Sequence, residues 1–202
     1  MSNETYQEHA VRHKLIVQYK NVILHPHAVT FSIEQEQARW KSVWAQLILL
    51  GFVCALLAIL STMITPTPLA AVPGMDVATE RSVVTIATML FIFVGTPISF
   101  FVVGGIVYGL CRIVHGQGTY LRQMYTLVLF GVPMVLLSSI LQLIPQTSAW
   151  LPWLPHIYSI YLLGCSIIAV HSMRRRLAIE IVAFLLVLAV IVLMGLLVLV
   201  LH

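Results

Sequence analysis

Histidine is the residue type in this sequence best suited to bind a metal, a haem or a pigment, because its ring nitrogens can act as ligands at neutral pH. His115 and His171 are expected at the same edge of two apolar segments, so that they could share one cofactor. Neither residue lies in a motif that is specific for ligation. The favoured interpretation is two interfacial histidines hydrogen-bonded to water or backbone, and neither a cofactor nor a metal site is predicted.

Other patterns of catalytic residues are missing from the sequence. It contains no nucleophile motif, no phosphate-binding loop and no carboxylate pair. The segment HGQGTY includes a GxG element, but it follows an apolar helix instead of a strand, so a dinucleotide site is not expected. Arg112 and Glu180 lie near the ends of apolar spans and are interpreted as boundary anchors whose side chains reach water. These features predict a protein that is not an enzyme.

Composition predicts that most of the chain lies in lipid. Of the 202 residues, 60% are hydrophobic and 9% are charged, whereas soluble domains average about 25% charged residues. The apolar residues form runs close to the ~20 residues that cross a ~30 Å hydrocarbon layer as a helix. The expected spans are residues 42–64, 82–111, 124–144, 156–172 and 177–201. The predicted fold class is an all-α membrane protein, a bundle of about five transmembrane helices.

Residues 1–41 are expected to form a cytoplasmic segment that precedes the transmembrane domain of residues 42–202. Its apolar positions recur with the spacing of one helical face, and basic residues lie on the rest of the surface. A basic amphipathic helix of this kind is typical of segments that lie on a membrane surface. A second short helix is expected from about Val29 to Lys41. The predicted membrane-surface residues are Arg12, Lys14, Leu15, Ile16, Tyr19, Lys20, Val22 and Ile23.

The Lys and Arg residues predict the orientation of the spans, because positive charge is retained on the cytoplasmic side. All of them except Arg81 fall in the N-terminal segment or in the second and fourth loops between spans. We therefore expect a multi-pass protein of the plasma (inner) membrane with a cytoplasmic N-terminus and an external C-terminus. This orientation also explains the formal net charge of +4, so nucleic acid is not expected as a partner.

Small residues and one proline predict how the helices pack. Gly51 with Ala55, and Gly105 with Gly109, form small-xxx-small pairs that allow two backbones to approach closely. Packing inside the bundle is the favoured role for these pairs, and dimerisation is the alternative. Pro133 in the third span frees backbone acceptors that neighbouring helices must satisfy, so this span is predicted to be packed inside the bundle.

Four segments occur in the order seen in a known family. They are VILHPHAVTF before the first span, the turn CRIVHGQGTYLRQ, the proline-bearing TLVLFGVPMVLL, and IYSIYLLGCSIIAVHSMRRRLAIEI. From about Val22 to Ala183 this order resembles bacterial members of the Yip1 domain family. The resemblance implies five spans with a cytoplasmic N-terminus. Eukaryotic relatives bind Rab-type GTPases, but the DLYGP-like stretch associated with them is missing here, so GTPase binding is not carried over.

Three functions are compatible with the sequence. The leading hypothesis is a non-catalytic scaffold or accessory subunit that binds other membrane proteins, or itself, within the lipid bilayer. The second is a channel or permease component. The polar residues available for its path are Ser99, Thr126, Ser138, Ser139 and Gln142. The third is a pigment- or haem-associated subunit of a membrane redox complex that uses His115 or His171.

Overall fold

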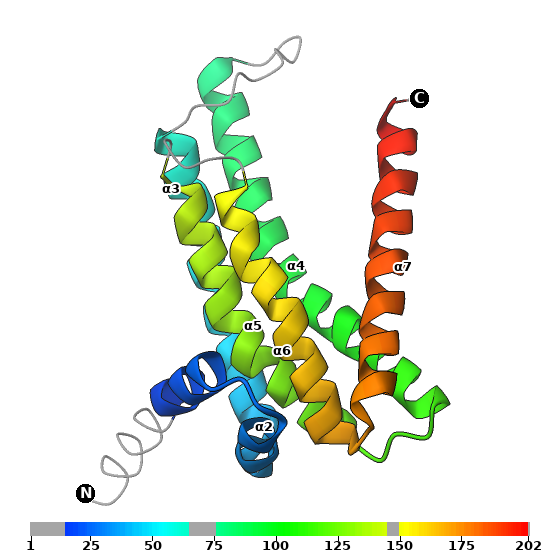
Figure 1. The fold of residues 1–202 in the computed structure, drawn as a ribbon. Helices are drawn as coiled ribbons and strands as arrows, with labels where there is room; N and C mark the ends of the chain where they lie inside the picture. The colour runs from blue at the N-terminus through cyan, green and yellow to red at the C-terminus, as the bar shows by residue number, and fades with distance from the viewer. Residues whose placement is uncertain (1–14, 65–75, 145–149, 202) are drawn as a thin grey trace, which may run out of the picture.

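The computed structural model describes residues 15–64, 76–144 and 150–201, and these ranges are almost entirely helical (Figure 1). Within them, 5 helices are long and apolar enough to cross a membrane. The predicted fold class, an all-α membrane protein with five spans, is confirmed. The spanning helices are α3 (Trp40–Ile64), α4 (Val77–Ile113), α5 (Tyr120–Gln142), α6 (Leu154–His171) and α7 (Arg175–Leu201).

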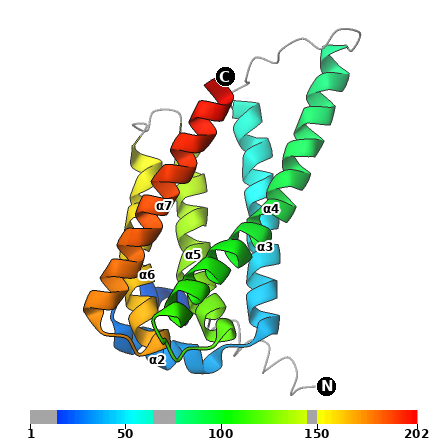
Figure 2. The same ribbon diagram turned by 90° about the vertical axis from the view of Figure 1, so that its right-hand side faces the viewer.

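Helix α4 begins before the expected start of the second span at residue 82. The Asp76 side chain caps it by accepting a hydrogen bond of 3.1 Å from the Thr79 amide. The hydrogen bonds from Thr79 also lower the pKa of the Asp76 carboxyl. With 37 residues the helix is longer than the bilayer core. It changes direction in its middle third, which contains Pro97 (Figures 1 and 2).

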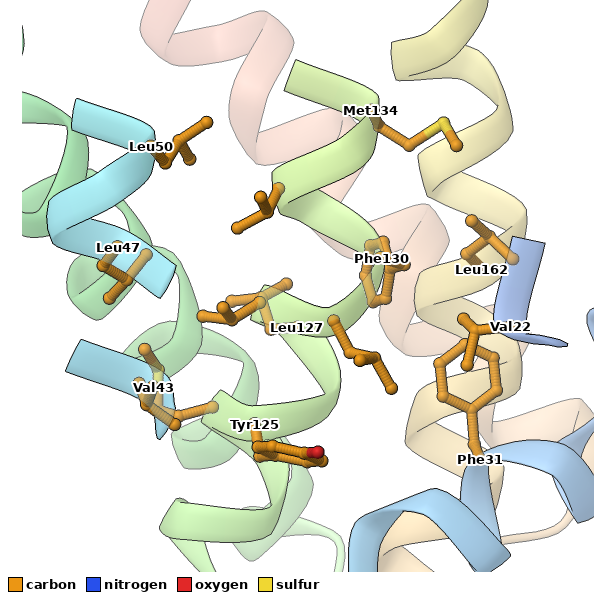
Figure 3. Packing of buried hydrophobic residues seen from close by; sticks show 14 of the residues in the cluster. Val22, Phe31, Val43, Leu47, Leu50, Tyr125, Leu127, Phe130, Met134 and Leu162 are labelled. Atoms are coloured by element: carbon orange, nitrogen blue, oxygen red, sulfur yellow. The ribbon is translucent and has the colours of Figure 1, made fainter. Parts of the chain in front are cut away.

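Helix α5 is the innermost span, as Pro133 led us to expect. Every residue from Gln123 to Val132 is buried, and Pro133 itself is half-buried. Figure 3 shows α5 between α3 and α6, where Leu47 of α3, Phe130 of α5 and Leu162 of α6 belong to one core. The prediction that the third span is packed inside the bundle is confirmed.

The N-terminal segment packs on this bundle instead of presenting its predicted face to the membrane. It contains a helix over Leu15–Leu24, then α2 (Ala28–Glu34) and the 3₁₀ helix η1 (Gln35–Gln37). Val22 and Phe31 are fully buried in the core formed around α5 (Figure 3). Tyr19 and Ile23 pack against the same core. The assignment of Val22, Tyr19 and Ile23 to the membrane surface is therefore corrected.

The exposed face of the Leu15–Leu24 helix is rotated about the helix axis relative to the apolar face that was predicted to lie on the membrane surface. Ile16 is 66% exposed, and Val17 and Lys20 are exposed beside it, whereas the polar Gln18 is buried. Arg12 and Lys14 lie outside the described residues. The second helix of the segment ends as an α-helix at Glu34, earlier than Lys41, and turns through η1 into α3.

Helix α7 is attached to the bundle only near its start. Ala178 and Ile181 are buried in a second cluster with Val107 and Cys111 of α4 and Ile167 of α6. Beyond these turns, the five consecutive residues of Val190–Met194 are each between 53 and 66% exposed. At 100° per residue, five positions cover all sides of a helix. The second half of α7 therefore packs on nothing in the described part of its own chain (Figures 1 and 2).

Candidate functional site

Buried polar side chains gather at one end of the bundle. We call this the basic end: α3, α5 and α7 begin there, and α4 and α6 end there (Figure 1). The helix termini at this end carry Arg39, Lys41, Arg112, Arg122 and the Arg174–Arg176 run. We call the buried polar set the polar junction. It consists of Gln18, Glu34, Gln46, Gln123, Thr126, Ser166 and His171.

The first part of the polar junction joins the N-terminal helix to α3 and α5. The Tyr125 hydroxyl donates to Gln18 Oε1 at 2.9 Å, and Gln18 Nε2 donates to Gln37 Oε1 at 2.9 Å. The Tyr19 hydroxyl donates to Gln46 Oε1 at 2.6 Å. Burial raises the pKa of Tyr19. These bonds link residues far apart in sequence and fix the N-terminal helix on the bundle.

Glu34 is the only acidic member of the polar junction. Its carboxylate accepts a long hydrogen bond of 3.4 Å from Asn21 Nδ2. Its second oxygen, Oε2, is buried and has no hydrogen-bond partner among the described residues. Buried carboxylates are costly unless they are well paired. Glu34 is therefore one of three members of the polar junction, with Gln123 and His171, that have a buried polar atom without a hydrogen-bond partner among the described residues.

Side chains of α6 satisfy backbone carbonyls at the break in the N-terminal segment. A proline at position 26 interrupts the helical hydrogen-bond pattern between Leu24 and Ala28. The Tyr158 hydroxyl donates to the Ile23 carbonyl at 2.7 Å, and the Tyr161 hydroxyl donates to the Pro26 carbonyl at 3.3 Å. The Cys165 thiol also lies 3.3 Å from the Pro26 carbonyl. Satisfying such groups matters beside a membrane span, because lipid offers no hydrogen bonds.

His171 lies at the end of α6 against the turn between α4 and α5. Its Nε2 atom is 3.1 Å from Gln123 Oε1, and its ring lies 6.1 Å from that of Tyr108. A Cβ atom added at Gly116 or Gly118 would lie 2.9 or 2.8 Å from His171 Nδ1. Glycine is required at both positions, since the turn and the imidazole touch. Within the described residues the Nδ1 atom is buried and has no hydrogen-bond partner.

His115 does not share the environment of His171. It is exposed, and its backbone φ of 63° lies in the left-handed region, next to the glycines of the turn. In the described part of the chain, no hydrogen bond or ring contact joins the two histidines. The two histidines therefore differ in burial and in their contacts. No group of three or more potential metal ligands occurs among the described residues.

Close helix packing occurs at Gly51 and Gly104. A Cβ at Gly51 would lie 2.7 Å from the Phe93 carbonyl oxygen of α4, and Ala55 one turn later is fully buried. A Cβ at Gly104 would overlap the Met124 sulfur of α5. In contrast, a Cβ at Gly105 or at Gly109 would meet nothing within 4 Å. The favoured role of that pair, packing inside the bundle, is corrected: the neighbouring Gly104 makes the contact.

Comparison with protein families decides the identity of the fold. A family model described as the Yip1 domain matches residues 20–197. The chain belongs to the Yip1 domain family. Comparisons with curated proteins and with solved structures gave no match.

In this Yip1 domain, the segments on which the resemblance was based contact one another. The VILHPHAVTF segment contributes the Ile23 and Pro26 carbonyls, and the IYSIYLLGC segment contributes the tyrosines and the cysteine that bind them. The HGQGT turn packs its glycines against His171 of the AVHS segment. Four members of the polar junction, Gln123, Thr126, Ser166 and His171, come from these segments.

Most of the polar junction was not predicted from the sequence, because its members are mainly neutral residues inside apolar segments. The Yip1 domain builds the junction largely from neutral amides and hydroxyls, such as the buried pair Thr126 and Ser166, whose oxygens lie 2.8 Å apart. A glutamine or hydroxyl residue inside an apolar run was the available signal, because such a group needs a partner from another helix. The chemistry of these groups suits hydrogen bonding between segments and offers no nucleophile activated by a base.

Proposed function

We propose that this Yip1 domain protein is a non-catalytic membrane protein that binds other membrane proteins, as a scaffold or an accessory subunit. The observation that carries the proposal lies in the second half of α7, where the side chains of Val190–Met194 are exposed on all sides of the helix. The tilt of a membrane helix is set by neighbouring helices and by interfacial aromatic or basic anchors. Residues 185–201 contain no Trp, Tyr, Lys or Arg. A partner helix is the neighbour that we infer for this part of α7.

The polar junction supports a binding role over transport. Two of the polar residues considered for a channel path are engaged between segments of the bundle: Thr126 with Ser166, and Ser138 with the Pro152 carbonyl at 2.8 Å. Their hydroxyls hold helices together. A scaffold needs this kind of fixed base, from which α7 can present a long apolar surface.

We also propose an orientation for the protein. The basic end carries every described Lys and Arg except Arg81, and Arg81 lies near the start of α4 at the opposite end. The positive-inside rule then assigns the basic end to the cytoplasmic side of the plasma (inner) membrane. The N-terminal segment is cytoplasmic in this orientation, and α7 ends at the external face.

Alanine substitutions in the second half of α7 test the proposed partner binding. Replacing Val190, Leu193 and Leu197 keeps the helix apolar but removes most of the contact surface of one face. Both proteins are extracted with a mild detergent and compared by native electrophoresis. We expect the wild type to migrate as a complex and this variant to migrate as a smaller species or without the complex. The matched control replaces Ile48, Phe52 and Leu56, an exposed stripe of α3, and should leave the complex intact. A monomer of the wild type in every mild detergent would contradict the proposal.

A further inference from the structure

A groove lies between α6 and the first half of α7. It has a volume of about 550 Å³, within the range of roughly 300–1,000 Å³ typical of ligand pockets. Ile160, Gly164 and Ile168 line it from α6, and Ala178, Val182 and Leu186 line it from α7. Figure 1 shows α6 and α7 close together at the basic end and farther apart toward the other end of the bundle.

Small residues create the space in this groove. A Cβ added at Gly164 would meet only Val182 Cγ2, at 4.0 Å. The neighbouring lining position on α7 is Ala178, which is fully buried. Because neither position carries a large side chain, α6 and α7 leave this groove between them instead of packing side chain against side chain. A longer side chain at Gly164 could enter the groove without displacing the backbone of either helix.

The walls of the groove on α6 and α7 are mostly apolar, and His27 of the N-terminal segment and Arg175 of α7 also line it. The two polar side chains on the α6 wall, Tyr161 and Cys165, are both directed to the Pro26 carbonyl at 3.3 Å. Arg175 is the one Lys, Arg, Asp or Glu residue that lines the groove. Its neighbour Arg176 pairs with Glu180 at 3.3 Å, whereas Arg175 forms no ion pair within the described ranges.

The length of the groove matches one leaflet of a bilayer. From Arg175 to Leu186 the helix rises roughly 17 Å at about 1.5 Å per residue. Half of a ~30 Å hydrocarbon core is about 15 Å. A lipid whose phosphate lies beside Arg175 would therefore place its acyl chain along the whole groove.

We propose that this groove binds one anionic phospholipid, with an acyl chain between α6 and α7 and the phosphate paired with Arg175. An arginine guanidinium is well suited to this role, because it forms two parallel hydrogen bonds with phosphate oxygens. The lipid fills the groove that the small residues leave open and supports the first half of α7. This inference goes beyond the proposed function, which concerns the second half of the same helix.

Native mass spectrometry of the purified full-length protein tests the proposal. The protein in detergent is titrated with phosphatidylglycerol or with phosphatidylcholine carrying the same acyl chains. We expect one phosphatidylglycerol to be retained per chain, with an affinity several-fold higher than that for phosphatidylcholine. Arg175→Gln should reduce the affinity for phosphatidylglycerol about fivefold, equivalent to roughly 1 kcal/mol per basic residue at a membrane surface. Arg176→Gln is the matched control and should have a smaller effect, since Arg176 is paired with Glu180.

Gly164→Leu tests the acyl chain separately from the headgroup. It should abolish tight retention of both lipids, because the leucine side chain occupies the groove. Equal affinity of the wild type for the two lipids, or equal affinity of the wild type and the Arg175→Gln variant for phosphatidylglycerol, would overturn the proposal. If the Gly164→Leu variant does not fold, the comparison of the wild type with the Arg175→Gln variant still tests the proposal. A partner helix found in the groove would also overturn it, whereas loss of the complex with the α7 variant concerns only the proposed function.

Discussion

Gly118→Ala is expected to lower the free energy of unfolding by about 3 kcal/mol, the upper end of what an overpacked site costs. The added methyl group would lie 2.6 Å from the Val170 carbonyl oxygen, 2.7 Å from Val170 Cγ1 and 2.8 Å from His171 Nδ1. The first of these atoms belongs to the backbone of α6, and His171 is buried. The turn between α4 and α5 must therefore move away from α6, which breaks the packing of the polar junction.

Gly109→Ala is the matched control for this prediction. It lies on α4 shortly before the same turn, and a Cβ there would meet nothing within 4 Å. We expect its free energy of unfolding, measured by denaturant titration in mixed micelles, to stay within about 0.5 kcal/mol of the wild type. Similar losses for the two variants would show that the turn does not touch His171 as described.

Phe31→Ala is expected to release the N-terminal segment from the bundle. Phe31 is fully buried, and its ring meets that of Phe130 edge to face with centroids 6.1 Å apart. Truncating a buried phenylalanine costs about 3–5 kcal/mol. Phe31 is the one buried apolar residue of the 7-residue helix α2, so its truncation removes most of the apolar burial that holds this helix on the bundle. The five spans should remain inserted, because their apolar length is unchanged.

Limited trypsin digestion measures this release. Cleavage after Lys20, identified by mass spectrometry, should become much faster in the Phe31→Ala variant than in the wild type. Ile33→Ala is the matched control on the same helix, since Ile33 is 60% exposed, and should be cleaved at the wild-type rate. If the wild-type segment is cleaved after Lys20 as fast as the Phe31 variant, the segment is not docked on the bundle.

The number and type of spans could be predicted because lipid imposes one strong rule. A chain in the hydrocarbon core must satisfy its backbone within each helix, so long apolar runs identify spans directly. Pro133 added a local reason to place the third span inside, and α5 is indeed the most buried helix. These predictions depend only on residues that are close in sequence.

Rotations about the helix axes could not be predicted in the same way. Gly104 and Gly105 differ by 100° around α4, and in a uniformly apolar helix no periodic pattern selects between them. The same difficulty affected the N-terminal helix, where Val22, predicted to face the membrane surface, lies in the core and Gln18 is also buried. Gln18 faces inward because it finds Tyr125, a residue 107 positions away. A polar side chain that has a hydrogen-bond partner in a distant segment can be favoured at a buried position over an apolar one. The spacing of residues along the sequence does not reveal such a partner.

The attachment of α7 connects the polar junction to the proposed function. Ala178 and Ile181 pack on the ends of α4 and α6, close to the turn that contacts His171. A variant that loosens this turn should therefore also change the direction of α7. The basic end fixes the start of α7, and the partner proposed above would fix its second half.

Site-specific photocrosslinking in native membranes tests the central claim most directly. A photoreactive amino acid replaces Leu193 in the exposed second half of α7, and the same amino acid at the fully buried Leu162 of α6 serves as the control. We predict adducts of defined protein mass from position 193, of the same mass as a component of the native complex, and only intramolecular products from position 162. Adducts with lipid alone from position 193 would contradict the proposal that this half of α7 binds another membrane protein.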